Sequence, residues 1–210
     1  MGTSHHLDLY LLRHGLTRWN VENRYLGHTD EPVMEIEELA ELKKELEVVE
    51  FDEVFSSDLL RCKETIEYLR PDQPYVSDEG LREFHFGDWE GRKYEELKDI
   101  PLYRQWIDNW EQYRVPGGES GEEFSDRITG WLSEFLGKTL VAEGPASHKV
   151  LIVTHGGVIR LLLSILVEAG SFWSWRISHG EGLHLTLEYR EERWTCSSLS
   201  VVPSQGNGRS

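Results

Sequence analysis

Two histidines stand at positions where chemistry is expected. An apolar run over residues 7–12 ends at Arg13-His14-Gly15, and a second run over residues 149–154 ends at His155-Gly156-Gly157. Short apolar runs of this length predict buried strands. A neutral imidazole can attack phosphorus and form a covalent intermediate, so a histidine at such a turn suits phosphoryl chemistry.

Both histidine turns are expected at one edge of a sheet. Ligands of open α/β sheets bind beyond the carboxyl ends of the strands, and each turn follows the carboxyl end of its strand. Gly15, Gly156 and Gly157 allow tight turns, and the helices expected after them offer N–H groups to an anion. The sequence therefore predicts a phosphate-sized site between His14 and His155.

Arg61 is a third contributor to this edge. It follows Ser56-Ser57-Asp58, where a predicted strand over residues 51–55 gives way to a helix over residues 59–69. Ser57 or Asp58 is expected to cap that helix, which places Arg61 in its first turn. The planar guanidinium suits bidentate contact with phosphate oxygens, and Arg13 is the natural opposing cation.

The remaining pattern alternates helices and strands and predicts a largely parallel sheet. Apolar spacing predicts a helix over residues 36–49, and Ser120 with Glu123 predicts a capping box at the start of a longer helix. Alternating stretches at 173–178, 182–189 and 193–201 predict late, partly antiparallel strands. We therefore expect an α/β, three-layer sandwich with helices on both faces of the sheet.

Four aromatic residues lie on a segment before Pro116 that is expected to be helical. Their side chains either pack into the core, which is the favoured interpretation, or wall the pocket as a lid; the four are Tyr103, Trp106, Trp110 and Tyr113. A lid of this kind favours an aromatic or nucleoside-like leaving group, because flat apolar surfaces stack well.

Composition limits the possible partners. The 210 residues carry 22 basic and 38 acidic side chains and a formal net charge of −16, which disfavours nucleic acid. Two distant cysteines suggest neither a disulfide framework nor a structural metal, and no apolar run is long enough to predict a membrane span. We expect one domain over residues 1–202, a flexible tail over 203–210, a cytoplasmic location and a monomer or homodimer.

The motifs together resemble the histidine phosphatase superfamily, which includes cofactor-dependent phosphoglycerate mutases and many small phosphatases. Five segments occur in the family's order: Arg13-His14-Gly15-Leu16-Thr17 with Trp19-Asn20; Ser56-Ser57-Asp58-Leu59-Leu60-Arg61 with Thr65; Leu81-Arg82-Glu83 with Phe86-Gly87-Asp88-Trp89-Glu90-Gly91; Pro116-Gly117-Gly118-Glu119-Ser120; and Thr154-His155-Gly156-Gly157.

The resemblance implies a role for each residue of the site. His14 is the nucleophile, and Arg13, Arg61 and His155 form the phosphate pocket, with His155 expected to be cationic. Glu83 is the acid–base residue. Asn20 and the backbone of Gly156 are expected to contact phosphate as well, although Asn20 could instead cap a local turn. No metal and no cofactor is expected.

Three functions stay open at this stage. The segment from Leu81 to Gly91 looks like the phosphatase branch, so hydrolysis of a small phosphorylated metabolite is favoured over a phosphoglycerate mutase. A non-catalytic binding module is the third possibility. The region after Gly27 departs from the family's pattern, which leaves alpha-ribazole phosphate, a sugar phosphate and a phosphoglycerate as candidate substrates.

Overall fold

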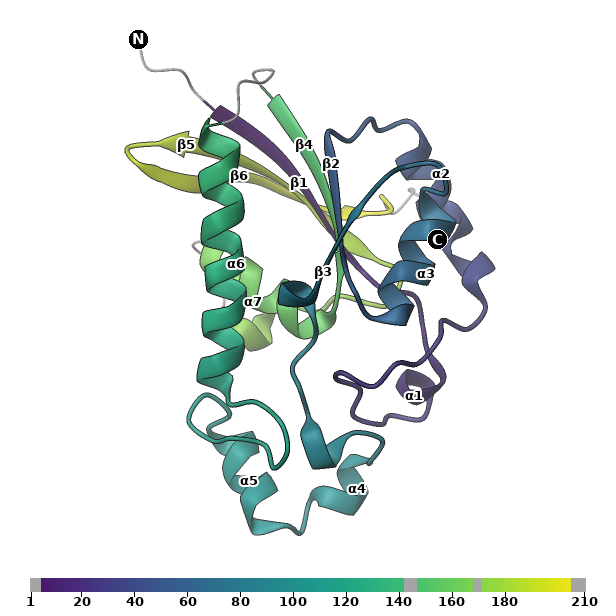
Figure 1. Cartoon of the computed structure of the whole chain (residues 1–210), viewed down its shortest axis with the longest axis vertical. Helices are drawn as coiled ribbons and strands as arrows, with labels where there is room; N and C mark the ends of the chain where they lie inside the picture. Colours follow the sequence, from purple (N-terminus) through teal and green to yellow (C-terminus); the bar gives the residue numbers. More distant parts are fainter. Residues whose placement is uncertain (1–4, 142–146, 168–170, 205–210) are drawn as a thin grey trace, which may run out of the picture.

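A six-stranded sheet forms the centre of the protein (Figure 1). The computed structural model describes residues 5–141, 147–167 and 171–204. The strand order is β3-β2-β4-β1-β5-β6, with β1 to β4 parallel and β5 and β6 antiparallel. The strands are β1 (His5–Arg13), β2 (Glu53–Ser57), β3 (Val76–Asp78), β4 (Ser147–Thr154), β5 (Gly182–Arg190) and β6 (Arg193–Val202).

Helices cover both faces of this sheet. The α-helices are α1 (Arg18–Val21), α2 (Ala40–Glu47), α3 (Leu60–Leu69), α4 (Tyr94–Leu97), α5 (Pro101–Asp108), α6 (Gly121–Val141) and α7 (Gly156–Leu166). Four short 3₁₀ helices complete the described elements: Ile36–Leu39, Glu79–Leu81, Gly87–Trp89 and Phe172–Ser174. Helices α4 and α5 lie beyond one end of the sheet, below it in Figure 1.

The alternation of side chains along the central strands produces two cores. Leu9 and Leu11 of β1 point to the face covered by α6 and α7, whereas Leu12 points to the face covered by α2 and α3. Val150 and Leu151 of β4 divide between the two faces in the same way. Strands buried on both faces are expected where helices lie above and below a parallel sheet. The expected α/β three-layer architecture is confirmed.

The start of α6 matches the sequence prediction closely. The Glu123 amide donates to the Ser120 hydroxyl at 3.2 Å, and the Ser120 amide donates to the Glu123 carboxylate at 3.0 Å. This reciprocal pair satisfies two amides that the first turn leaves unpaired. The predicted apolar face of the helix is buried, including Phe124 and Ile128.

The predicted cap of α3 is wrong. The N-cap residue is Leu59, whose side chain makes no capping hydrogen bond. Asp58 instead pairs with Arg82, at 2.7 Å between Nε and Oδ1. The Leu60 amide donates to Asp30, 30 residues away in the chain, at 2.8 Å. A distant carboxylate has therefore replaced the local cap, and local sequence could not reveal this.

Two further expectations need correction. Residues 173–178 do not form a strand; a 3₁₀ turn over Phe172–Ser174 is followed by irregular backbone. The predicted helix before Pro116 ends at Asp108, so Trp110 and Tyr113 lie beyond it. Residues 203 and 204 of the expected tail follow β6, and residues 205–210 lie outside the described part of the chain.

Candidate active site

The two histidine turns meet, as predicted from their strands. Strands β1 and β4 pair in parallel with Arg13 opposite Thr154, so His14 and His155 follow at adjacent strand ends. The His14 amide donates to the Thr154 carbonyl at 3.0 Å, and the two imidazole rings lie 5.2 Å apart between centroids. Adjacent parallel strands thus bring together residues that are 141 positions apart in the chain.

A backbone contact fixes the tautomer of His14. Nδ1 lies 2.7 Å from the carbonyl oxygen of Gly15. A carbonyl only accepts, so Nδ1 carries the hydrogen and Nε2 keeps its lone pair in the neutral ring. Burial, followed by the charges of Arg61 and Arg13, holds the pKa of His14 well below its ordinary value. The side chain is therefore neutral near pH 7, with an unprotonated Nε2.

Thr65 of α3 positions the turn that carries His14. Its hydroxyl accepts the Gly15 amide at 2.9 Å and donates to the Arg61 carbonyl at 2.7 Å. Both groups are buried. Thr65 therefore ties the first histidine turn to the helix that carries Arg61.

Two arginines place positive charge in this buried region. Arg61 is fully buried, and its Nη1 and Nη2 donate to the carbonyls of Thr29 and Gly27 at 3.0 and 2.7 Å. Arg13 Nη1 donates to the Ile177 carbonyl at 2.7 Å. Burial lowers the pKa of Arg13 to about 10, which leaves it cationic at neutral pH.

Both guanidinium groups retain binding capacity. The Nε atoms of Arg13 and Arg61 are buried and have no hydrogen-bond partner among the described residues. Neither arginine forms a salt bridge within the described part of the chain. A buried cation is costly unless it is paired, so an anion of the size of phosphate would complete this site.

His155 is brought into the site and is buried there among polar side chains. It is fully buried, its Nε2 lies 2.9 Å from the Ser57 hydroxyl, and Cys62 Sγ lies 3.5 Å from the same nitrogen. Burial, followed by the charges of Arg61, His14 and Arg13, holds the pKa of His155 well below its ordinary value. The protein alone therefore favours neutral His155. Its cationic form beside a bound phosphate stays a prediction.

The carboxylate of Glu83 lies against the first turn of α7. Its oxygens accept the Phe84 amide at 2.9 Å and the Gly157 amide at 3.0 Å. A Cβ atom at position 157 would lie 2.3 Å from Glu83 Oε1, so the carboxylate approaches the helix only because residue 157 is glycine. Gly156 serves Arg13 similarly, because a Cβ there would lie 3.2 Å from its guanidinium carbon.

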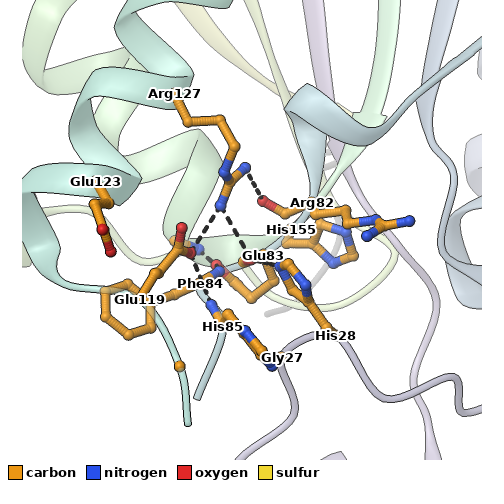
Figure 2. Close-up of polar contacts among 12 residues, drawn as sticks. Gly27, His28, Arg82, Glu83, Phe84, His85, Glu119, Glu123, Arg127 and His155 are labelled. Atoms are coloured by element: carbon orange, nitrogen blue, oxygen red, sulfur yellow. Dashed lines mark hydrogen bonds and ion pairs between the residues drawn. The ribbon is translucent and has the colours of Figure 1, made fainter. Parts of the chain in front are cut away.

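Arg127 of α6 holds the backbone that carries Glu83 (Figure 2). Its Nη1 donates to the carbonyls of Gly80 and Arg82 at 3.0 and 2.8 Å, and its Nη2 lies 3.3 Å from the carbonyl of Glu83. The same Nη2 donates to Glu119 at 2.8 Å, and Glu119 also accepts the His85 amide at 2.8 Å. One guanidinium therefore contacts three backbone carbonyls in the segment that ends at Glu83.

Asn20 serves as a cap in the structure. Its Oδ1 accepts hydrogen bonds from the amide and the hydroxyl of Thr17, at 3.1 and 2.8 Å. The side chain thus stabilises the short turn of α1, the alternative that the sequence left open. Its contact with phosphate stays a prediction.

Two residues near the site were missed in the sequence. The His179 ring lies 5.4 Å from that of His14, and its buried Nε2 has no partner in the described residues. Burial, with the charges of Arg13 and Arg61, lowers the pKa of His179 to about 3. Arg160 lies one turn after Gly156 on α7 and lines the same cavity as Glu83 and Gly157. Neither residue belongs to a local pattern that could have indicated this proximity.

The described residues contain neither a membrane-spanning helix nor a group of metal ligands. Across the described ranges, no helix combines the length and apolar character needed to cross a membrane. Within the same ranges, no three histidine, cysteine or acidic side chains are grouped so that they could hold a metal ion.

Comparisons with known proteins agree with the geometry. Residues 9–202 match the histidine phosphatase superfamily (branch 1). The chain is 31% identical to the adenosylcobalamin/alpha-ribazole phosphatase of Escherichia coli K12, over 83% of this chain and 87% of that one. It is 30% identical to the "Probable phosphoglycerate mutase GpmB" of Salmonella choleraesuis, over 96% and 93% of the two chains.

Solved structures show the same similarity in three dimensions. The alpha-ribazole phosphatase from Shigella flexneri superposes with a TM-score of 0.80 at 28% identity, covering 96% of this chain and 100% of that one. Bacillus stearothermophilus YhfR gives a TM-score of 0.78 at 29% identity, covering 95% and 98%. With the family match spanning nearly the whole chain, the protein belongs to branch 1 of the histidine phosphatase superfamily.

Proposed function

We propose that the protein is a phosphomonoesterase that hydrolyses a small phosphorylated metabolite through a phosphohistidine on His14. The observation that carries the proposal is the unprotonated Nε2 of a buried, neutral His14 beside two buried arginines whose Nε atoms lack partners. Membership of the family supports phosphatase or mutase chemistry in general.

In the first step, His14 Nε2 attacks phosphorus in line, and the bond from phosphorus to the ester oxygen breaks. Glu83 donates a proton to the departing oxygen, so the alcohol leaves neutral. Arg13 and Arg61 offset the negative charge on the phosphoryl oxygens, and fixed positive charge in a dry site stabilises the transition state strongly. The product of this step is phosphohistidine and an alcohol.

In the second step, the Glu83 carboxylate takes a proton from water, and the resulting nucleophile attacks the phosphohistidine. The bond between phosphorus and Nε2 breaks, which restores His14 and releases inorganic phosphate. Acid–base assistance of this kind contributes about 10²–10⁴ in rate. His155, neutral in the protein alone, becomes easier to protonate when a phosphate dianion lies beside it, because opposite charge raises the pKa of an imidazole.

The proposal is tested with p-nitrophenyl phosphate in the presence of a chelator. The parent is expected to release p-nitrophenol, and His14→Ala is expected to show none above background, because the covalent step is lost. His148→Ala is the matched control, since His148 lies at the opposite end of β4 from the site. Labelled substrate should leave acid-labile phosphate on the parent only. Release that persists in His14→Ala would refute the phosphohistidine route.

A phosphoglycerate mutase is the second candidate, favoured by the similarity to GpmB. The same phosphohistidine would then return its phosphoryl group to another hydroxyl instead of to water. Interconversion of 2- and 3-phosphoglycerate, compared with phosphate release from both, separates the two activities. We expect phosphate release to dominate.

A further inference from the structure

An apolar cavity of about 470 Å³ adjoins the candidate active site. Most of its wall is aromatic, and we name it the aromatic cavity after six of its lining residues: Phe84, Trp106, Trp110, Phe124, Phe172 and Trp173. Its volume falls in the ordinary range for sites that bind small organic molecules.

The aromatic cavity and the phosphate pocket share residues. Glu83 and Gly157 line the cavity, and these two residues are joined by the 3.0 Å hydrogen bond at the start of α7. The group that is proposed to protonate the leaving oxygen therefore faces the cavity. An alcohol that receives its proton from Glu83 has its carbon skeleton at this opening.

The cavity wall has few charged or hydrogen-bonding groups that could bind a polar alcohol. Of the described residues that line the cavity, only Glu83 and Arg160 carry charge. A sugar or a glycerate would bury hydroxyl or carboxylate groups here with few partners, which costs binding free energy. Flat apolar rings would instead meet aromatic faces and edges, which attract one another.

The arrangement of the rings also suits a flat guest. Trp110 and Phe172 lie 4.8 Å apart at an interplanar angle of 30°, and Trp173 stands nearly perpendicular to Phe172, at 84°. A flat ligand in this corner would meet the face of one aromatic ring and the edge of another. Trp173 is 61% exposed and therefore lies at the mouth of the cavity rather than in the core.

Arg160 borders the same mouth. Its guanidinium lies 5.9 Å from the Trp173 ring centre, and its Nε donates to the Trp175 carbonyl at 3.0 Å. A cation over an indole face is attractive, so Arg160 favours one orientation of Trp173. Arg160 of α7 therefore positions the residues at the mouth, and the first turn of the same helix contacts Glu83.

We propose that the aromatic cavity binds the alcohol part of the substrate and selects phosphomonoesters of flat, apolar alcohols over those of small polar alcohols. This inference rests on the proposed phosphomonoesterase function. Trp173 and Ile107 line this cavity and are its specificity-determining residues for the test. Because both are exposed, substituting them carries the least risk to the core.

The test compares 1-naphthyl phosphate with glycerol 2-phosphate in the parent, Trp173→Ala and Ile107→Ser. The matched control is Ile165→Ser, because Ile165 is 45% exposed, against 41% for Ile107, and does not line the cavity. The ratio of kcat/KM for the two substrates is expected to fall about 2- to 10-fold in Trp173→Ala, corresponding to about 0.5–1.5 kcal/mol for a lost aromatic pair. The ratio should stay at the parental value in Ile165→Ser.

A binding measurement separates this inference from the proposed function. Quenching of tryptophan fluorescence by 1-naphthol should have a lower midpoint concentration in the parent than in Trp173→Ala. Naphthol binding without hydrolysis of either ester would overturn the phosphatase function and leave the cavity assignment standing. Hydrolysis of both esters, with the same ratio in the parent and both cavity variants, would overturn the cavity assignment alone.

Discussion

At the scale of single residues, the surroundings of His14 set its tautomer and its charge. The Gly15 carbonyl fixes the proton on Nδ1, and burial beside two arginines disfavours a second proton. We predict that the His14 ring is neutral, with hydrogen on Nδ1, at pH 6.5, where an ordinary imidazole is half protonated. Nitrogen-15 NMR of histidine-labelled protein measures this directly, with His14→Asn identifying the resonances. A His14 signal that titrates near pH 6.5 would contradict the prediction.

Glu83 depends on the absence of a side chain at position 157. In Gly157→Ala the new methyl group would meet Glu83 Oε1 at 2.3 Å, so the carboxylate must move from the helix. We predict a fall in kcat of about 10²-fold, at the low end of the contribution expected from a displaced acid–base group.

The control for that prediction is Gly130→Ala in α6, where an added Cβ meets no atom within 4 Å. It should leave kcat unchanged and stabilise the protein by up to about 1 kcal/mol, because alanine favours helices. Equal kcat in both alanine variants would show that Glu83 does not need its contact with Gly157. Steady-state kinetics and urea unfolding measure the two effects.

At the scale of elements, α6 positions the loop before Glu83 through Arg127. We predict that Arg127→Gln lowers kcat about 10-fold with a smaller change in KM, because the loop loses several donors at once (Figure 2). Unpaired carbonyls should also lower the free energy of unfolding, by about 1–3 kcal/mol.

The exposed Lys138, further along α6, provides the comparison for Arg127. Lys138→Gln removes a surface charge whose ion pair with Glu134 contributes little, so kcat should match that of the parent. If Arg127 were only structural, Arg127→Gln would lose stability while retaining the parental kcat at a temperature where it is folded. Kinetics at 25 °C combined with unfolding curves distinguish the two roles.

The elements also show what sequence alone can predict. The meeting of His14 and His155 was predictable, because apolar runs that end in histidine and glycine indicate adjacent strand ends. The roles of Asp30, Arg160 and His179 were not, since each reaches its partner through tertiary packing and belongs to no local pattern. Residues 173–178 alternate like a strand because Trp175 and Ile177 pack against the core while Ser174, Arg176 and Ser178 are exposed, and an irregular segment can do this without joining a sheet.

At the scale of the whole molecule, buried neutral histidines make stability depend on pH. In the unfolded chain, His14 and His155 bind protons near pH 6.5, whereas in the folded protein their pKa values lie well below this. The unfolded state therefore binds more protons below pH 6.5, and the free energy of unfolding falls as the pH falls. We predict a loss of about 1.4 kcal/mol per pH unit for each of the two histidines.

Urea unfolding at pH 7.5 and pH 5.5 tests this expectation. His14→Asn should reduce the pH dependence of the free energy of unfolding by the contribution of about one bound proton. This holds whatever its effect on stability at pH 7.5. A parent that is equally stable at both pH values would show that the buried histidines can be protonated within the fold.

The strand order has a consequence for the newly made chain. Strand β1, which carries the His14 turn, is synthesised before all the other strands, yet its neighbours in the sheet, β4 and β5, are the fourth and fifth to be made. During translation the apolar β1 therefore lacks both of its sheet neighbours until β4 (Ser147–Thr154) has left the ribosome. The candidate site, which needs the ends of both β1 and β4, cannot form before β4 is made. The interval before β4 emerges is when chaperones would be most needed.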